Sequence, residues 1–261
     1  MATTQTPQQP EPMISVIGLY KSFTDNQVLL GINLEVVRGE SLVVVGGSGA
    51  GKSVFLKHLI GLLQPDEGHV VVDGIDLTLA SPESALELRK RFGMSFQEGA
   101  LFDSMTVFDN IAFPIRRHTK KSAAEVAERV RECLTLVRLQ GVEDKQPAEL
   151  SGGMRRRVGF ARAIALEPEI LLFDEPTTGL DPINTAAIGG VINQLRAELD
   201  VTIVTITHDM NLANQIADRI AMIRHGRITV IETPREFTET SDPYVRAFLD
   251  SEVPSGAEDE L

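Results

Sequence analysis

Cysteine, tryptophan and long apolar runs are scarce or absent in this sequence of 261 residues. The single cysteine, Cys133, cannot form a disulfide within the chain, which is typical of proteins kept in a reducing cytosol. No apolar run approaches the roughly 20 residues of a membrane-spanning helix. Residues 1–12 have neither the basic start nor the apolar segment of a secretion signal. We therefore expect a cytoplasmic chain that is neither secreted nor membrane-embedded by itself.

Basic charge is also in short supply, with 25 Lys and Arg against 37 Asp and Glu and a net charge of −12. Affinity for nucleic acid comes from clustered Lys and Arg, so this balance argues against a general nucleic-acid surface and leaves room only for a local basic site. The hydrophobic fraction of 43% is that of a globular chain. Its length suits one large domain, or a domain with a subdomain.

Residues 41–63 pass from an apolar strand through a glycine-rich turn into a helix. Gly46, four further residues, and then Gly51, Lys52 and Ser53 fit the spacing of a P-loop. Glycines there allow backbone N–H groups to curl around phosphate oxygens, and the helix start adds a positive dipole end. We expect Lys52 to reach the β and γ phosphates and Ser53 to ligate Mg²⁺. The alternative, a chance glycine turn, leaves the flanking strand and helix unexplained.

Hydrophobic patterning predicts an α/β fold around this stretch. Short alternating runs predict strands in an antiparallel layer at 14–19, 28–37 and 69–72. Helical spacing predicts helices at 52–63, 82–91, 122–139 and 152–166. Continuous apolar runs predict buried parallel strands at 170–173 and 201–207. We also expect a hairpin at 220–231 that turns at 225–226, and a short helix near 244–249.

Cys133 lies within one of these predicted helices. A Ser122-x-x-Glu125 capping box precedes apolar residues at helical spacing, namely Val126, Val130, Cys133, Leu134 and Val137. This pattern favours a buried thiol that packs in the core over a reactive one.

Polar residues follow the buried strands at the ends where parallel α/β sheets bind ligands. Asp174 and Glu175 come directly after one strand, and His208 follows the other. We expect Asp174 to hold the Mg²⁺ hydration shell, Glu175 to orient and deprotonate the attacking water, and His208 to bond the γ-phosphate. Taken singly, an Asp-Glu pair is as often a helix cap and a lone His is usually structural, so the catalytic interpretation depends on the P-loop.

About 120 residues separate the P-loop from Asp174, too many for a single crossover, so the sequence predicts an inserted subdomain. In it, Ser151, Gly152 and Gly153 open a helix whose buried stripe is Met154, Val158, Ala161 and Ala165. The helix start is a second candidate anion site. A serine cap followed by flexible glycines is the alternative. Two such sites in one chain suggest a ligand shared between two chains.

Over residues 14–250 the sequence resembles the nucleotide-binding subunits of ATP-binding cassette (ABC) transporters. The matching motifs are GGSGAGKS (46–53) with Walker A, Gln97 with the Q-loop, LSGGM (150–154) with the signature, ILLFDE (170–175) with Walker B, 179–181 with the D-loop, His208 with the switch histidine, and Phe23 with the aromatic that stacks on adenine. Met154 departs from the usual Gln, which affects a polar contact to the partner's nucleotide but not the contact of Ser151.

The resemblance implies the site residues. Catalytic residues would be Glu175, His208 and Gln97, and the Mg²⁺ ligands would be Ser53, Gln97 and Asp174. The expected ATP contacts are Phe23, Gly46, Gly47, Ser48, Gly49, Ala50, Gly51, Lys52, Ser53, Val54, Ser151, Gly152, Gly153 and Asp181.

The segment 96–119 and the segment 242–250 are similar to ATP-binding subunits of MCE-associated lipid transporters of the maintenance-of-lipid-asymmetry type. Four aromatic residues lie within eighteen positions here: Phe96, Phe102, Phe108 and Phe113. By residue physics alone they form either subdomain core or a docking groove. The family implies both, with a permease helix inserted beside Gln97.

The resemblance further implies a P-loop ABC domain at 13–250, with a parallel core sheet, an antiparallel β layer and a helical subdomain at about 98–166. A disordered tail at 1–12 and an acidic tail at 251–261 would flank it. The expected function is ATP hydrolysis by a head-to-tail homodimer that drives phospholipid transport. The expected partners are an integral membrane permease and an MCE-type lipid-binding protein, with the chain peripheral on the cytoplasmic face of the inner membrane.

Two rival functions are compatible with parts of the sequence. One is a soluble ABC ATPase in cofactor assembly or repair, which would not co-purify with a multispan membrane protein. The other is a small-molecule kinase with a P-loop, which needs an acceptor pocket and leaves LSGGM unexplained.

Overall fold

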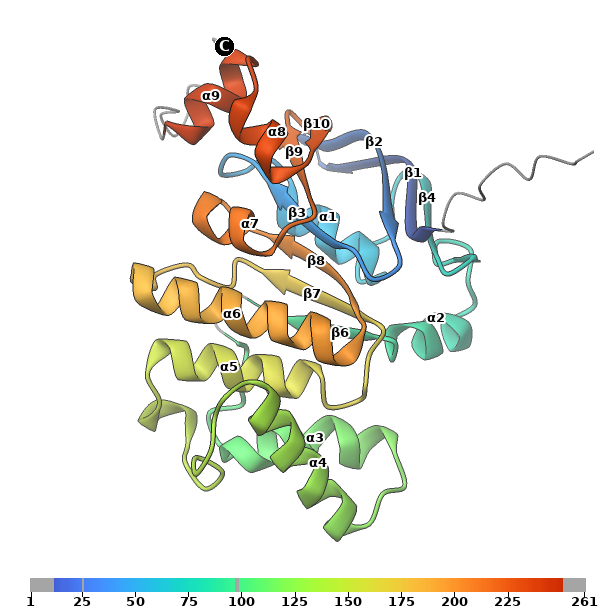
Figure 1. The fold of residues 1–261 in the computed structure, drawn as a ribbon. Coiled ribbons are helices and arrows are strands. Elements are labelled where there is room, and N and C mark those ends of the chain that lie inside the picture. The colour runs from blue at the N-terminus through green and yellow to red at the C-terminus, as the bar shows by residue number, and fades with distance from the viewer. Residues whose placement is uncertain (1–11, 25, 97–98, 251–261) are drawn as a thin grey trace, which may run out of the picture.

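A six-stranded sheet forms the centre of the computed structural model, which describes residues 12–24, 26–96 and 99–250 (Figure 1). The strand order is β10-β9-β3-β8-β7-β6. The bounds are β3 Ser41–Val45, β6 Phe92–Ser95, β7 Ile170–Asp174, β8 Thr202–Ile206, β9 Arg219–Arg224 and β10 Arg227–Glu232. All neighbours are parallel except β9 and β10. Every residue of β3 and β8 is buried, as a sheet covered on both faces requires, so the predicted parallel core is confirmed.

A second sheet covers one face of the first. It has the order β2-β1-β4-β5, with bounds β1 Pro12–Phe23, β2 Asn26–Val37, β4 Glu67–Val72 and β5 Ile75–Asp76. All its pairs are antiparallel, which confirms the predicted layer. Helix α1 (Lys52–Leu59) lies between the two sheets (Figure 1). Its buried residues Phe55 and Leu56 share one hydrophobic cluster with Val44 of β3 and Ile14 of β1.

Helices α5, α6 and α7 lie on the opposite face of the parallel sheet, and α3 and α4 pack beyond α5 (Figure 1). Their bounds are α3 Val107–His118, α4 Ala123–Leu136, α5 Gly152–Ala163, α6 Pro182–Leu199 and α7 Met210–Ile216. Phe160 of α5 meets Phe173 of β7 with ring centroids 4.6 Å apart. Elsewhere lie α2 Pro82–Arg89, the 3₁₀ turn η1 Pro147–Glu149, α8 Pro234–Glu239 and α9 Pro243–Leu249. Within the described ranges, no helix is both long and apolar enough to cross a membrane.

Several predicted elements are correct and several need correction. The hairpin turns at 225–226, where His225 and Gly226 both have positive φ, and the capping box of α4 is formed by Ser122 and Glu125. Helix α1 ends four residues earlier than predicted, because Gly61 (φ 67°) turns the chain back against Leu77. The sequence patterns did not predict α3, α6, α7, α8, β5 or β6.

The predicted tails fall largely outside the described residues, which exclude 1–11 and 251–261. Pro12, placed in the N-terminal tail by its composition, is the first residue of β1. The thiol of Cys133 is fully buried in the hydrophobic cluster that helices α3 to α7 form with one face of the parallel sheet, the helical cluster. Burial raises the pKa of this thiol to about 11. This confirms the core-packing role.

Candidate functional site

The glycine-rich turn between β3 and α1 has a backbone that only glycine adopts easily. Gly49 and Gly51 have φ values of 82° and 97°. A Cβ on Gly51 would lie 2.9 Å from Leu29 Cδ2 and 3.1 Å from the carbonyl oxygen of Val28, so β2 leaves no space for a side chain. The turn therefore presents its backbone N–H groups at the start of α1, as phosphate binding requires.

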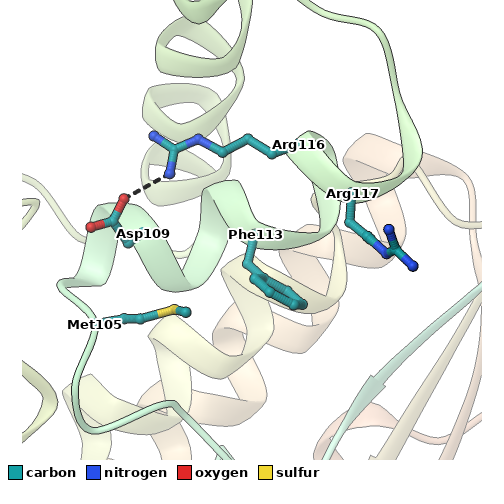
Figure 2. A pocket seen from close by; sticks show the side chains of 5 residues that line it. All are labelled: Met105, Asp109, Phe113, Arg116 and Arg117. Atoms are coloured by element: carbon teal, nitrogen blue, oxygen red, sulfur yellow. Dashed lines mark hydrogen bonds and ion pairs between the residues drawn. The ribbon is translucent and has the colours of Figure 1, made fainter.

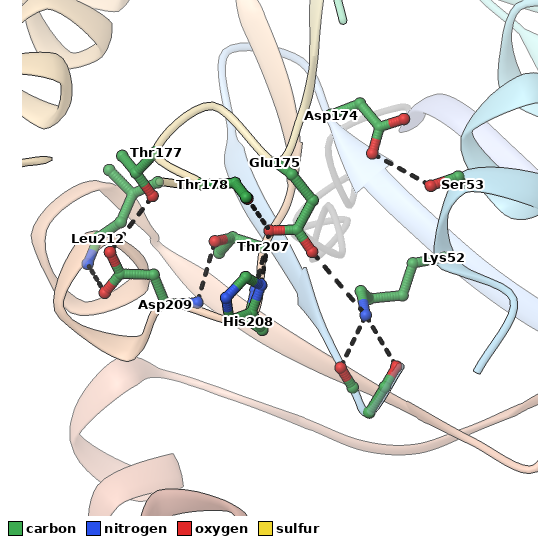
Figure 3. Close-up of polar contacts among 12 residues, drawn as sticks. Lys52, Ser53, Asp174, Glu175, Thr177, Thr178, Thr207, His208, Asp209 and Leu212 are labelled. Atoms are coloured by element: carbon green, nitrogen blue, oxygen red, sulfur yellow. Dashed lines mark hydrogen bonds and ion pairs between the residues drawn. The ribbon is translucent and has the colours of Figure 1, made fainter. Parts of the chain in front are cut away.

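Lys52 is the buried charge at the centre of this turn. Its Nζ donates to the carbonyl oxygens of Gly46 (2.7 Å) and Gly47 (2.9 Å) and lies 3.9 Å from Glu175 Oε1 (Figure 3). The Lys52 ammonium is thus a compact charge held against the glycine-rich turn. It can serve as a positive point charge for a phosphate chain.

Ser53 and Asp174 bring two oxygen ligands together from α1 and β7. Ser53 Oγ donates to Asp174 Oδ1 over 3.2 Å (Figure 3). Burial, more than any other cause, raises the pKa of Asp174, and the neighbouring Glu175 carboxylate adds to this. Mg²⁺ is commonly held by one or two protein oxygens together with substrate phosphates, so this hydroxyl and carboxylate suit it. The described residues contain no cluster of three His, Cys, Asp or Glu that would hold a metal alone.

Glu175 follows β7 in a strained conformation, with φ of 49°. Its N–H donates to the carbonyl oxygen of Ile206 in β8 (2.8 Å), which fixes the backbone. Oε2 lies 2.9 Å from Nδ1 of His208 and accepts from Thr178 Oγ1 over 3.4 Å (Figure 3). The ends of β7 and β8 thus bring together the carboxylate and the imidazole that the sequence predicted to meet beside Lys52.

Ser151 lies at the start of α5, on the opposite face of the sheet from α1 (Figure 1). Its hydroxyl accepts from the N–H of Met154 over 3.3 Å, so it caps the helix, while the residue itself is exposed. Met154 is half-buried and packs against the helical cluster. The structure therefore shows the serine cap, and the exposed position of Ser151 leaves the anion site a prediction.

Two further predicted contact residues lie on the surface. Phe23, at the end of β1, is 43% exposed, and Lys21 Nζ lies 5.5 Å from its ring centroid. Asp181 caps α6 by accepting from the N–H groups of Ile183 and Asn184, each over 3.0 Å. The pKa of Asp181 is lowered, and the main cause is the hydrogen bond that it accepts from the Asn184 side chain. Gln97, expected to touch Mg²⁺ and the attacking water, lies outside the described residues.

Sequence reasoning missed polar residues that support the site. Thr177 Oγ1 donates to Asp209 Oδ2 (3.2 Å), and the N–H of Asp209 donates to Thr207 Oγ1 (3.0 Å), which ties the segment after Glu175 to the segment around His208. The pair Thr177-Thr178, two residues after Glu175, was the available signal, because threonines at a strand end commonly bond within turns.

The four clustered aromatics divide into two kinds. Phe108 is half-buried against the helical cluster, whereas Phe96 is 38% exposed and Phe102 and Phe113 are each 43% exposed. The ring centroids of Phe102 and Phe113 lie 5.2 Å apart. A groove of about 480 Å³ lies beside them, lined by Met105, Asp109, Phe113, Arg116 and Arg117 (Figure 2). Core and exposed roles therefore both occur in this segment.

Residues 29–178 match the family model described as "ABC transporter", and the chain belongs to this family. It is an ABC ATPase, a class that binds ATP and uses Mg²⁺.

Particular relatives differ in what their names say they transport. The chain is 47% identical to "Probable ribonucleotide transport ATP-binding protein mkl" of Mycobacterium leprae, over 90% of this chain and 68% of that protein. It spans about two thirds of these mycobacterial relatives, 66% in Mycobacterium tuberculosis. It is 38% identical to "Intermembrane phospholipid transport system ATP-binding protein MlaF" of Haemophilus influenzae, over 92% of this chain and 91% of that protein.

Solved structures share the fold. A dimeric bacterial ABC transporter cassette matches with a TM-score of 0.79 and 31% identity, over 85% of this chain and 99% of that chain. A dimeric post-hydrolysis state of the same cassette, bound to ADP and Pi, matches with a TM-score of 0.77 and 30% identity, over the same shares of the two chains.

Proposed function

We propose that this chain is the ATP-hydrolysing subunit of a phospholipid transporter and works through a separate membrane permease linked to an MCE-type lipid-binding protein. The observation that carries the proposal is the meeting of Lys52, Ser53, Asp174, Glu175 and His208 at the carboxyl ends of β3, β7 and β8. A P-loop without Glu175 and His208 would support binding alone. Their proximity supports hydrolysis.

Each residue has a proposed task in this chemistry. Residues 46–54 hold the phosphates through backbone N–H groups, and Lys52 neutralises charge on the β and γ phosphates. Ser53, Asp174 and Gln97 hold Mg²⁺, which when bound screens and orients the phosphate oxygens. Glu175 deprotonates the attacking water, and His208, now bonded to Glu175, turns to the γ-phosphate.

The second half of each site comes from a second copy of the chain in this proposal. Ser151 is exposed at the start of α5, on the far side of the sheet from α1, with Gly152 half-buried and Gly153 buried behind it, so in this proposal Ser151 leads the contact with the nucleotide of another chain. A two-fold head-to-tail pair supplies both sites in this way. Asp181 lines the same interface, and Phe23 stacks on adenine. The unit that does this is residues 13–250, with the helical subdomain at about 98–166.

The groove beside Phe102 and Phe113 is the proposed contact with the permease. Exposed aromatics next to a hollow are typical of a docking surface for a partner helix. ATP favours the closed pair over the open one, and this difference in affinity is what moves the permease. The chain would then sit at the cytoplasmic face of the inner membrane without entering it.

Phospholipid is the proposed cargo because the phospholipid-system relative matches nine-tenths of both chains. Other relatives are named for ribonucleotide transport and, in "Methionine import ATP-binding protein MetN" of Carboxydothermus hydrogenoformans, for methionine import. The test is to purify the chain with its membrane partner and to analyse bound small molecules by mass spectrometry. Phospholipid in the complex, with ATPase activity stimulated by phospholipid vesicles, supports the proposal. Stimulation by ribonucleotides or methionine instead, or purification without any multispan protein, contradicts it.

A further inference from the structure

Arg156, on helix α5, is a charged residue to which the proposed chemistry gives no task. It is only 9% exposed, and its Nη2 donates to the main-chain carbonyl oxygen of Thr178. Burying a guanidinium is costly unless its N–H groups are bonded to protein acceptors. The contact between α5 and the segment after Glu175 is therefore held by a charge-assisted bond.

Thr178 is linked in turn to Glu175. Its Oγ1 donates to Glu175 Oε2 and its N–H to the Glu175 carbonyl oxygen, each over 3.4 Å. Glu175 itself has a strained φ of 49°, so its conformation depends on the contacts around it. When ATP and water bind, the Glu175 carboxylate exchanges its present partners for them and shifts. Because Thr178 is bonded to Glu175, this shift moves the turn that carries the Thr178 carbonyl.

The other end of the same segment supports the start of α5. A Cβ on Gly152 would lie 3.6 Å from Leu180 Cδ2 and 3.9 Å from Arg156 Nη1, and one on Gly153 would lie 3.2 Å from Asn184 Oδ1. The two glycines thus lie directly on residues 180–184, with the Arg156 guanidinium beside them. The position of Ser151, one residue earlier, depends on this support.

We propose that Arg156 is a positioning residue that couples the two ATP sites of the dimer. The inference rests on the proposed shared sites, in which one chain gives Glu175 to one ATP and Ser151 to the other. The bonds from Glu175 to Thr178, and from Thr178 to Arg156, connect these two contributions within a single chain. ATP that repositions Glu175 at one site thereby repositions the α5 start at the other.

The test compares pairs that have two live sites with pairs that have one. One-site pairs are made by mixing a Lys52→Ala chain with a Ser151→Arg chain, which leaves one intact P-loop facing one intact signature. The quantity measured is the ratio of ATP turnover in two-site pairs to turnover in one-site pairs. With Arg156 present, coupled sites make this ratio well above two. Arg156→Met in every chain should bring this ratio down to about two, whatever the absolute rates. Arg156→Lys, which keeps a positive group that can donate to the Thr178 carbonyl, should restore part of the excess.

Arg157→Met is the matched control, because Arg157 lies on the same helix and donates to a backbone carbonyl, that of Arg138, away from the site. It should leave the ratio unchanged. A ratio that Arg156→Met does not alter, or that Arg157→Met lowers equally, overturns the coupling role and leaves Arg156 as packing. A ratio of two in the wild-type background overturns it as well. Absence of nucleotide trapping in all one-site pairs would instead contradict the shared site, and so the proposed function.

Discussion

The two helix starts proposed to hold phosphate differ in how much of a ligand site each builds within its own chain. At α1, the turn has glycines with positive φ and a buried Lys52, and Ser53 is bonded to Asp174 at the end of β7. At α5, the exposed Ser151 caps its own helix through the N–H of Met154, and no lysine occurs in the LSGGM motif. The start of α1 thus has groups for the phosphates and for Mg²⁺ within one chain, whereas the start of α5 offers one hydroxyl at a helix end. A helix dipole and one hydroxyl alone bind anions weakly, so the α5 start needs a ligand already held elsewhere.

The largest effect is expected from disabling chemistry at the α1 side alone. Glu175→Gln removes the base but keeps the size of the side chain and its capacity to bond His208. Turnover should fall by about 100-fold or more, with ATP binding within a few-fold of wild type. Steady-state hydrolysis and ATP-dependent dimerisation measure the two quantities. Hydrolysis within a few-fold of wild type would show that Glu175 is not the base.

A pair of substitutions separates the cap from the ligand contact at the α5 side. Ser151→Asp keeps a good helix cap but places a carboxylate against the γ-phosphate, whereas Ser151→Ala loses the cap at a cost of about 1 kcal/mol in unfolding free energy. We expect the Asp variant to keep its stability and lose nucleotide trapping, and the Ala variant to lose stability and keep more trapping. Denaturant unfolding measures the stability, and vanadate trapping measures the nucleotide trapping. If the Asp variant traps normally, Ser151 is only a cap.

Two phenylalanines of the segment 96–119 allow core packing to be separated from permease contact. Phe108→Ser removes a ring that packs against the core and should cost about 2 to 3 kcal/mol of unfolding free energy. Phe102→Ser removes an exposed ring and should leave stability within about 0.5 kcal/mol while weakening permease pull-down. Equal losses of stability in the two variants would assign Phe102 to the core.

The smallest effect is expected from an ion-pair cluster that links the two sheets, in which Arg91 and Glu169 precede β6 and β7 and Asp73 follows β4. Arg91 Nε and Nη2 bond Glu169 (2.6 and 2.7 Å), and Nη2 bonds Asp73 (2.7 Å). The pKa values of the Glu169 and Asp73 carboxyls are both lowered, and the hydrogen bonds from Arg91 are the main cause. Their stabilisation is therefore present above the unfolded pKa values and lost as pH falls through the folded ones.

Arg91→Ala should cost about 1 kcal/mol at pH 7, because the pairs are partly exposed, and progressively less below about pH 4. Urea unfolding at several pH values measures this. A cost that stays constant down to pH 2.5 would mean that Arg91 acts through packing and not through its charge.

Local patterns predict much of this molecule and miss its longer-range parts. The P-loop, the buried strands and the α4 capping box follow from short-range rules that act within a few residues. Helix α3 was missed because its interior contains Pro114, which removes a backbone donor, and α6 because its Gly189-Gly190 pair breaks the helical pattern. In α6, Gly189 lies against α7: a Cβ there would lie 2.2 Å from Gln215 Oε1, so the end of the Gln215 side chain would have to move to admit a larger residue.

The same division holds at the site. The residues at strand ends could be placed because parallel strands end at one edge of a sheet. The role of Arg156 could not, because its bond to the Thr178 carbonyl joins segments 22 residues apart through the backbone, which leaves no mark on the residue types.

The most direct test of the central claim mixes two inactive proteins. The Lys52→Ala homodimer lacks both P-loop lysines, and the Ser151→Arg homodimer has a bulky side chain at both signatures, so neither should trap nucleotide. In a mixed pair both lesions fall on one site, and the other joins an intact P-loop to an intact signature. With subunit exchange confirmed, we expect trapping to return at one site per mixed pair. If mixed pairs form and no trapping returns, the two helix starts do not share a ligand between chains.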